Sequence, residues 1–522
     1  MTGEATYALT RSAILRLLGV VYLVAFLIVV RQGDPLIGHD GLLPADRFLA
    51  AIAAETGSRA SAFAALPTLF WLDASDRALH AVGWTGLVLS AAVVLGATNA
   101  LLQLALWALY LSVVQVGQIF YGYGWEVQLL ETGFLAVFLC PVRSVRPSAA
   151  PSPPVVVIWL FRWLIVRIMW GAGLIKLRGD PCWRDLTCLA WHYETQPIPN
   201  PLSWWLHARP LWFHRAGAAF NHFVELLAPF FVVGPRRLRS TAGILFVAFQ
   251  VTLILSGNLS FLNWLTIVPA LACFDDASLA WLLPRALRER ALSRAAAIGP
   301  PSALHRGAAW TFAAVVALLS IAPVLNLLSP HQAMNRSFDP LHLVNTYGAF
   351  GSVGRERDEV ILEGTSDDAI GPDTEWREYE LPCKPGDVAR APCVISPYHL
   401  RLDWQMWFAA MASAGSEPWL LHLAAKLLAG DPGVKALLAR DPFPDRPPRY
   451  VRAELYRYEF TRPGDGSPDW WRRTYVRSYL RPLSLDDPEL RRYLERFDLA
   501  GNEKGAGKSP APFPRLDRRG AR

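Results

Sequence analysis

The sequence predicts a polytopic α-helical membrane domain followed by a C-terminal α+β domain outside the membrane. Of its 522 residues, 52% are hydrophobic and 12% are aromatic, including 21 tryptophans. A soluble chain of this length can bury a large core with a much less apolar composition. Apolar segments long enough to cross a bilayer recur as far as residue 328, and a more polar sequence follows them.

Nine segments carry the roughly 17 to 25 apolar residues that a membrane-spanning helix requires. The first, Ser12–Val30, is followed by Arg31 without a small-residue cleavage site, so we expect it to remain as a span. Together the spans define a membrane domain over residues 1–330. The expected spans are residues 12–30, 80–97, 99–119, 126–141, 155–175, 216–234, 240–256, 259–275 and 307–328.

The distribution of arginine predicts the orientation, because short cytoplasmic loops carry an excess of Lys and Arg. With a cytoplasmic N-terminus, every arginine-rich short loop lies inside, and nine spans place the C-terminal domain outside. The net charge of +7 is therefore patterned by topology, and no nucleic-acid partner is expected. The inner arginines are Arg143, Arg146, Arg236, Arg237, Arg239, Arg285, Arg288, Arg290, Arg294 and Arg306.

Residues 335–502 are expected to form the extracytoplasmic α+β domain, and residues 503–522 a disordered tail. Strands are predicted at 356–362, 376–381, 450–461 and 471–480, and helices near 403–413, 418–428 and 432–438. The apolar alternation of the third strand changes phase between Leu455 and Tyr456, which predicts a β-bulge. Asp431 followed by Pro432 predicts the start of the last helix.

Six cysteines divide by the expected side of the membrane. Cys140 and Cys273 fall at cytoplasmic helix ends and are expected to be free thiols. The other four fall outside, where disulfides persist, and allow three connectivities. Local pairing closes the shortest loops, and neither pair has the C-x-x-C spacing of a redox-active site. The expected disulfides, structural in role, are Cys182–Cys188 and Cys383–Cys393.

Several polar side chains lie within the expected spans, where an ionisable group costs roughly 2.5 to 3.5 kcal/mol on insertion scales. Such groups are expected to face the bundle and to pair with one another. Arg167 and Glu225 are both expected near the middle of the membrane. The alternatives are a network that fixes helix packing or a polar cavity open to the outside. The members are Glu131, Arg162, Arg167, Asn221, His222 and Glu225.

Lys176 ends the fifth span and begins the outer loop, residues 176–215. One interpretation is a snorkelling lysine that anchors the helix end. The other is a base, because lysine can lose its proton when it is desolvated. In an enzyme, Lys176 would act with His192, His222 or Glu225. His192 and Glu194 near cysteines give only a weak metal pattern, so neither a metal nor a cofactor is expected.

Two long stretches resemble the lipase maturation factor family. The first is GAGLIKLRGDPCWRDLTCLAWHYETQPIPNPLSWWLH (171–207), followed by NHFVELLAPF (221–230); the second comprises NTYGAFGSVGRERDEVILEG (345–364) and CKPGDVARAPCVISPYHLRLDWQMWFAAM (383–411). The resemblance implies a multi-pass protein of the endoplasmic reticulum membrane that assists folding and assembly of secreted dimeric lipases. In a bacterial source the corresponding membrane is the cytoplasmic one. The implied partners are extracytoplasmic client proteins, lipases by resemblance, and membrane lipid.

A shorter match, A-G-L-x-K-L followed by Trp183, is similar to the transmembrane domain of vitamin K-dependent gamma-carboxylases. That resemblance implies a catalytic base at Lys176. Two functions therefore compete: a non-enzymatic maturation factor, which we favour, and a membrane enzyme acting at an outward-facing polar cavity around Lys176. An exposed apolar groove on the outer domain would indicate client binding, whereas a tight polar cavity touching Lys176 would indicate the enzyme.

Overall fold

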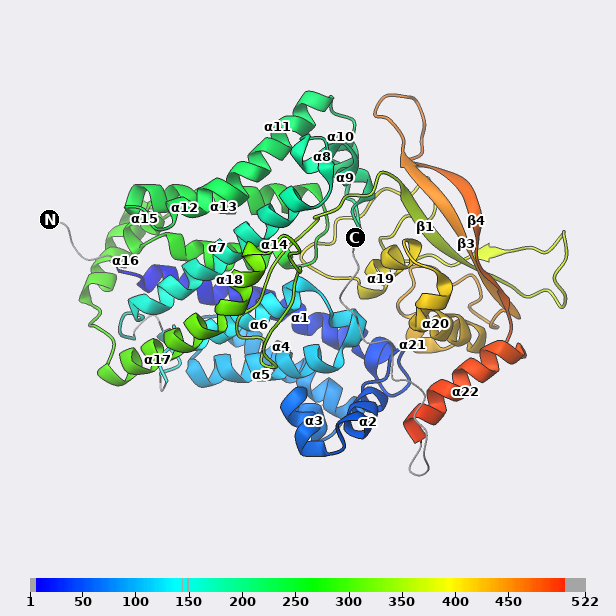
Figure 1. Ribbon diagram of the computed structural model, residues 1–522, viewed down its shortest axis with the longest axis horizontal. Helices are drawn as coiled ribbons and strands as arrows, with labels where there is room; N and C mark the ends of the chain where they lie inside the picture. Colours follow the sequence, from blue (N-terminus) through cyan, green and yellow to red (C-terminus); the bar gives the residue numbers. More distant parts are fainter. Residues whose placement is uncertain (1–5, 143, 148–149, 503–522) are drawn as a thin grey trace.

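The computed structural model describes residues 6–142, 144–147 and 150–502. A bundle of apolar helices forms one part of the molecule, and an antiparallel sheet with its own helices lies against one end of the bundle (Figure 1). The main bundle helices are α1 (Ala8–Ile37), α4 (Asp76–Val94), α5 (Ala100–Val116), α6 (Gly124–Val137), α7 (Val155–Arg178), α11 (Leu211–His222), α12 (Ala228–Phe231), α13 (Arg236–Ser256), α14 (Leu262–Ala270), α17 (Ala303–Leu319) and α18 (Ile321–Leu328).

A helix lies in each of the nine ranges predicted to span the membrane, but fewer helices are long enough to establish a span. Five described helical segments are long and apolar enough to cross a membrane. A bent pair of helical segments, Leu262–Cys273 and Asp276–Leu282, would make a sixth span if the two count as one, but the chain turns by 115° between them. The prediction of nine is thus supported only as a bundle with five or six candidate spans. The shortfall has physical reasons: α5 and α6 have only 17 and 14 residues, and the predicted span 216–234 is divided among α11, a π-helical turn and α12.

Short helices fill the loops of the bundle. α2 (Ala45–Thr56) and α3 (Arg59–Ala65) lie between α1 and α4, and the loop 176–215 contains α8 (Pro181–Arg184), α9 (Leu189–Thr195) and α10 (Pro201–His207). α10 begins with a capping box between Asn200 and Ser203 and has Pro201 in its first turn. α15 (Asp276–Leu279) and α16 (Arg285–Ala297) lie at the opposite end of the bundle from the sheet (Figure 1).

The C-terminal domain contains a four-stranded antiparallel sheet in the order β2-β1-β3-β4. Its register shifts between Leu455 and Tyr456, where the sequence predicted a bulge. The second predicted strand is reduced to two residues, and α22 was not predicted. The elements are β1 (Arg357–Thr365), β2 (Arg377–Glu378), β3 (Tyr450–Phe460), β4 (Trp471–Leu483), α19 (Arg401–Ala410), α20 (Pro418–Ala429), α21 (Pro432–Lys435) and α22 (Pro488–Asn502).

Local signals explain several boundaries. The Asp431 side chain accepts a hydrogen bond from the backbone of Val434 and caps α21 as predicted. α20 begins with Pro418 and ends at Gly430, whose φ of 69° is left-handed and favours glycine. The predicted inner arginine Arg143 and the predicted tail, residues 503–522, lie outside the described residues.

The bundle and the C-terminal domain share one continuous hydrophobic core. Buried side chains from α1, α6 and α7 belong to the same cluster as side chains from α19, α20 and β3. At the far end of the bundle, Asp276 accepts hydrogen bonds from the backbone amides of Ala8 and Leu9, at 2.8 and 2.7 Å. The far end of the bundle is therefore held by polar contacts between distant segments of the chain.

Candidate functional site

Lys176 lies in the last turn of α7 and forms a closed polar group with two residues of the following helices. Its Nζ donates hydrogen bonds to Glu225 Oε1 at 2.6 Å and to Asn221 Oδ1 at 3.0 Å. The Asn221 amide donates to the other carboxylate oxygen of Glu225 at 2.8 Å. All three residues are buried. The ammonium and carboxylate therefore compensate each other, and Asn221 fixes their geometry.

A π-helical turn (Phe223–Leu227) presents Glu225 to Lys176 between α11 and α12. Such turns insert one residue into a helix and occur frequently at functional positions. Gly173 allows α7 to approach this turn, because a Cβ there would lie 2.6 Å from Leu226 Cδ2 and 3.0 Å from Glu225 Cβ. The close approach of the two helices is thus a condition for the Lys176–Glu225 pair.

Aromatic side chains cover the lysine. The Trp183 ring centroid lies 5.0 Å from Lys176 Nζ, and the Trp183 carbonyl pairs with the His222 ring at 2.9 Å. His192 packs edge-on against Phe350, with centroids 4.7 Å apart. Burial, together with the charge of Lys176, lowers the pKa of His192 to about 4. The four candidate enzyme residues therefore lie near one another, but Lys176 is engaged in an ion pair with Glu225.

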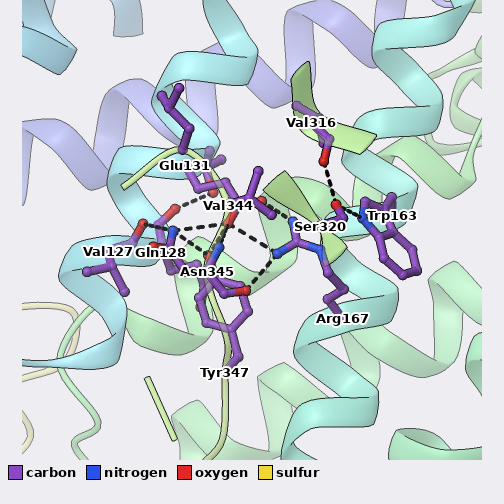
Figure 2. Close-up of polar contacts among 12 residues, drawn as sticks. Val127, Gln128, Glu131, Trp163, Arg167, Val316, Ser320, Val344, Asn345 and Tyr347 are labelled. Atoms are coloured by element: carbon purple, nitrogen blue, oxygen red, sulfur yellow. Dashed lines mark hydrogen bonds and ion pairs between the residues drawn. The ribbon is translucent and has the colours of Figure 1, made fainter. Parts of the chain in front are cut away.

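Arg167 pairs with Glu131, not with Glu225, a choice of partner that the sequence left open. Figure 2 shows the guanidinium of Arg167 on α7 facing the Glu131 carboxylate on α6. Both side chains are buried. A segment of the C-terminal region completes the site: the Asn345 carbonyl accepts from Arg167 at 2.7 Å, and the Tyr347 hydroxyl donates to Glu131 at 2.6 Å.

The segment 345–347 therefore lies between α6 and α7, well inside the helical bundle (Figure 2). The backbone amide of Asn345 donates to Glu131 Oε2 at 3.0 Å, and its side-chain amide donates to the same oxygen at 3.1 Å. Gly171 on α7 makes room, because a Cβ there would lie 2.3 Å from the Tyr347 carbonyl oxygen. The ion pair of the bundle thus depends on a segment that hydropathy assigns to the outer domain.

A third buried ion pair connects the two parts of the molecule. Arg401 on α19 lies 2.9 Å from Glu126 at the start of α6, and neither side chain is exposed. The Arg401 guanidinium also lies 3.5 Å from the centroid of the Tyr121 ring. Gln32 near the end of α1 accepts from the Arg401 amide at 3.0 Å and donates to the His399 carbonyl at 2.7 Å. The end of α1 and the start of α6 are thereby fixed to α19.

Both predicted disulfides are present, Cys182–Cys188 and Cys383–Cys393, and Cys140 and Cys273 are free and buried. Asn258, between α13 and α14, holds the second disulfide loop, since its side chain bonds the Cys393 carbonyl at 2.9 Å and the Ile395 amide at 2.8 Å. The disulfides therefore stabilise loops that contact other parts of the chain.

The loop formed by residues 176–215 is bonded to the sheet. Arg357 on β1 donates to the carbonyls of Glu194 at 2.8 Å and Pro197 at 2.9 Å. The Glu194 carboxylate accepts from the Phe460 amide at 2.7 Å, and burial raises the pKa of that carboxyl. These contacts join the loop to both β1 and β3.

The one group of potential metal ligands among the described residues is Asp180, Cys182 and Cys188. Its two sulfur atoms are joined in a disulfide, which removes the thiolates that a metal would require. His192 and Glu194 bond to different neighbours and do not converge. The residues present thus do not fit a metal site.

The predicted membrane network is divided into three separate groups. Arg162 bonds the Ala272 carbonyl at 2.8 Å and the Tyr7 hydroxyl at 3.0 Å, apart from the Glu131 and Glu225 pairs. His222 lies next to the Lys176 group through its contact with Trp183. The sequence reasoning missed four residues that complete the buried pairs, namely Glu126, Asn345, Tyr347 and Arg401. Three of them occur in the stretches that carried the resemblance.

The bundle contains helices that are apolar and long enough to cross a bilayer, and a buried ion pair joins it to a sheet domain at one end. Together these features define a multi-pass membrane protein of two parts. Family models match both parts. The lipase maturation factor transmembrane domain matches residues 9–281, and the lipase maturation factor C-terminal domain matches residues 343–481. The chain belongs to the lipase maturation factor family.

Individual relatives agree with this assignment. The chain is 52% identical to lipase maturation factor 1 of Bos taurus, over 92% of this chain and 90% of the relative. It is 51% identical to lipase maturation factor 1 of Homo sapiens, over 94% of this chain and 90% of that relative. It is 32% identical to lipase maturation factor 2 of Homo sapiens, over 94% of this chain and 85% of that relative. No solved structure matches.

Proposed function

We propose that this protein assists the folding and assembly of secreted lipases from a position in the membrane. The observation that carries the proposal is the buried connection between the bundle and the C-terminal domain, made by the Arg401–Glu126 pair and by the segment 345–347. Such a connection holds a folded surface at a fixed position beside the bilayer, where emerging clients would meet it. The names of the relatives support lipases as the clients.

We further propose a membrane domain over residues 1–330, an outer loop over 176–215 and an extracytoplasmic domain over 335–502. The family matches, which leave residues 282–342 between them, support this division. With nine spans and a cytoplasmic N-terminus, Gln32, Glu126 and Asn258 all lie at outer helix ends. All three contact the C-terminal domain, which is the arrangement that nine passes require.

A reporter fusion tests this orientation. Green fluorescent protein and alkaline phosphatase, each fused after Ala500, report opposite sides of a membrane. We expect phosphatase activity without fluorescence, together with the reverse result for fusions in the 143–154 loop. Fluorescence after Ala500 would contradict the nine-span topology. In an animal cell the proposed membrane is that of the endoplasmic reticulum, and in a bacterium it is the cytoplasmic membrane.

The alternative, a membrane enzyme using Lys176, is not favoured. Lys176 is held beside Glu225, and this pairing supports an anchor that fixes α7 to the following helices. The same interpretation extends to Glu131 and Arg167, whose role we propose is to seat the segment 345–347. Membrane lipid is the remaining proposed partner, on the apolar outer faces of the spans.

Co-expression with a secreted dimeric lipase tests the function directly. Cells lacking their own maturation factor would produce the lipase with the wild-type protein or with the Arg401→Met variant. We expect secreted lipase activity to rise with the wild type, with lipase protein amounts unchanged, and to fall with the variant. A wild-type protein that accumulates in the membrane without raising lipase activity would overturn the proposal.

A further inference from the structure

β4 forms one edge of the sheet in the C-terminal domain, and much of it is exposed. β4 is the last strand in the sheet order, so only β3 pairs with it. Residues Arg472–Ser478 are exposed on both faces, including Tyr475 at 55% and Val476 at 41%. A long edge strand with free backbone groups is a template for pairing with another chain.

The register identifies which backbone groups face outward. The Thr461 amide donates to the Trp470 carbonyl at 3.1 Å, while the Trp470 amide donates to Val388, so this single bond gives the phase of the ladder that begins at Trp471. From Phe460↔Trp471 to Tyr456↔Tyr475 the register is unbroken. Hydrogen-bonded and non-hydrogen-bonded pairs alternate in an antiparallel ladder. The N–H and C=O groups of Trp471, Arg473 and Tyr475 therefore point away from β3, toward the free edge.

One contact already uses this edge. The Val388 carbonyl accepts from the amides of both Trp470 and Trp471, at 3.0 and 3.1 Å, so the chain itself contacts the beginning of the edge. Beyond Trp471, the described part of the chain supplies no further strand to the edge. The first outward donor is thus paired with the carbonyl of a turn residue, and the donors of Arg473 and Tyr475 follow it along the edge.

We propose that the free edge of β4 binds an extended, acidic segment of an unfolded client polypeptide by β-strand addition. This inference rests on the proposed function. Main-chain hydrogen bonds supply affinity with little dependence on client sequence, which suits a factor that receives chains before they fold. Tyr475 and Val476 offer apolar contact beside the edge.

The charge of β4 selects the acidic partner. Arg472 and Arg477 are exposed, and neither forms an ion pair with a described carboxylate. A second copy of β4 would bring these arginines together, so like-charge repulsion opposes edge-to-edge dimers. An acidic strand places carboxylates opposite the same side chains. The arginines thus protect the edge from self-pairing and leave it open to a client.

Proline substitutions test the direction of the donors in the full-length protein in nanodiscs. The probe is a fluorescein-labelled ten-residue peptide of alternating valine and aspartate. Tyr475→Pro removes an outward donor and should weaken peptide binding by about tenfold or more while the unfolding temperature stays near wild type. Tyr475→Ala keeps the donor and should bind within about twofold of wild type. Equal binding by the wild type and Tyr475→Pro would overturn the proposal.

Two matched controls separate the backbone from other causes. Thr474→Pro removes a donor that faces β3, so it should lower the unfolding temperature, unlike Tyr475→Pro. The same peptide with every backbone amide N-methylated keeps its side chains but loses its donors, and it should not bind. Binding of the N-methylated peptide at wild-type affinity would contradict strand addition.

Charge reversal tests the edge without altering the backbone, and it remains informative if Tyr475→Pro fails to fold. Arg472→Glu combined with Arg477→Glu should abolish binding of the valine–aspartate peptide and create binding of a valine–lysine peptide. Unchanged preference for the acidic peptide would overturn the proposal. A wild-type dimer detected by light scattering, lost in Tyr475→Pro and without peptide binding, would identify a second copy as the occupant and also overturn it.

The lipase assay distinguishes this inference from the function on which it rests. We expect Tyr475→Pro to lower secreted lipase activity while Tyr475→Ala preserves it. A wild-type protein that matures lipase together with an equally active Tyr475→Pro variant would overturn strand addition alone. A wild-type protein without maturation activity would overturn the proposed function, and the peptide measurements would still decide whether β4 binds strands.

Discussion

The guanidinium of Arg401 lies 2.9 Å from the carboxylate of Glu126, although 275 positions of the chain separate the two residues. Neither side chain is exposed. Taking two charges out of water is expensive, and only good geometry and further hydrogen bonds repay that cost. Here the Tyr110 hydroxyl also donates to Glu126, and the Phe120 carbonyl accepts from Arg401. The pair therefore acts as a specific connection between α6 and α19.

Removing one partner of this pair should be strongly destabilising. Arg401→Met leaves the Glu126 carboxylate buried without its counter-charge, at a cost of about 3–5 kcal/mol. The free energy of unfolding in lipid nanodiscs, followed by tryptophan fluorescence during denaturant titration, measures the loss. Glu126→Gln together with Arg401→Met should recover part of it, because no unpaired charge remains.

The exposed pair Arg285–Glu289 provides the control for this measurement. Its side chains are 91% and 69% exposed, so Arg285→Met should change the free energy of unfolding by less than about 1 kcal/mol. Equal effects of Arg285→Met and Arg401→Met would show that the buried pair contributes no special connection.

Substitutions at Lys176 and Glu225 can distinguish a structural role of Lys176 from a role as a catalytic base. Lys176→Met should lower accumulation of the folded protein, because it leaves the buried carboxylate of Glu225 unpaired. The expected loss in the free energy of unfolding is about 3–5 kcal/mol. Lys176→Met combined with Glu225→Gln should restore accumulation, because glutamine still accepts the hydrogen bond from Asn221. In the lipase co-expression assay the double variant should mature the client. A well-folded double variant without activity would instead support the enzymatic interpretation.

Hydropathy and local pattern predicted the elements, but they did not predict the partners. The change of phase at Leu455 and Tyr456 is a local property of one strand, so the bulge was readable from the sequence. Arg167 had two acidic candidates, Glu131 and Glu225, on different helices. Helical periodicity gives the face of a residue but not the neighbour that the face meets. The choice between the two carboxylates therefore needed the tertiary packing.

A second kind of failure concerns the segment 345–347. Asn345 and Tyr347 belong to a polar stretch that follows the last apolar helix, and composition assigns such a stretch to the outside. In the structure they complete the Glu131–Arg167 pair inside the bundle. Because a scan for apolar spans evaluates each segment alone, it cannot detect an irregular segment that is stabilised by bonds to buried charges.

Gly171 tests whether that segment must insert. Gly171→Ala places a Cβ 2.3 Å from the backbone oxygen of Tyr347, so either α7 or the segment 345–347 must shift. We expect the free energy of unfolding to fall by about 1–3 kcal/mol. Gly307→Ala is the matched control: it lies in α17, where a Cβ would meet nothing within 4 Å, and the substitution should be neutral or slightly stabilising. Unfolding temperatures of the two variants decide the matter, and equal values would contradict the close approach.

His192 should make the stability of the protein depend on acidic pH. Its folded pKa is lowered to about 4, chiefly by burial, whereas a histidine in the unfolded chain titrates near 6.5. As the pH falls below about 6.5 the unfolded state takes up the proton first. The contribution of His192 to folding is therefore complete at neutral pH and is lost progressively down to about pH 4.

Comparison of variants isolates this contribution from the titration of other groups. We expect the free energy of unfolding of wild type to fall more steeply between pH 7 and pH 4.5 than that of His192→Leu, by on the order of 3 kcal/mol at most. His331→Leu, at an exposed position, should retain the wild-type slope. A wild-type slope in His192→Leu as well would mean that the ring accepts a proton in the folded state, and the packing of His192 against Phe350 beside Lys176 would then be looser than described.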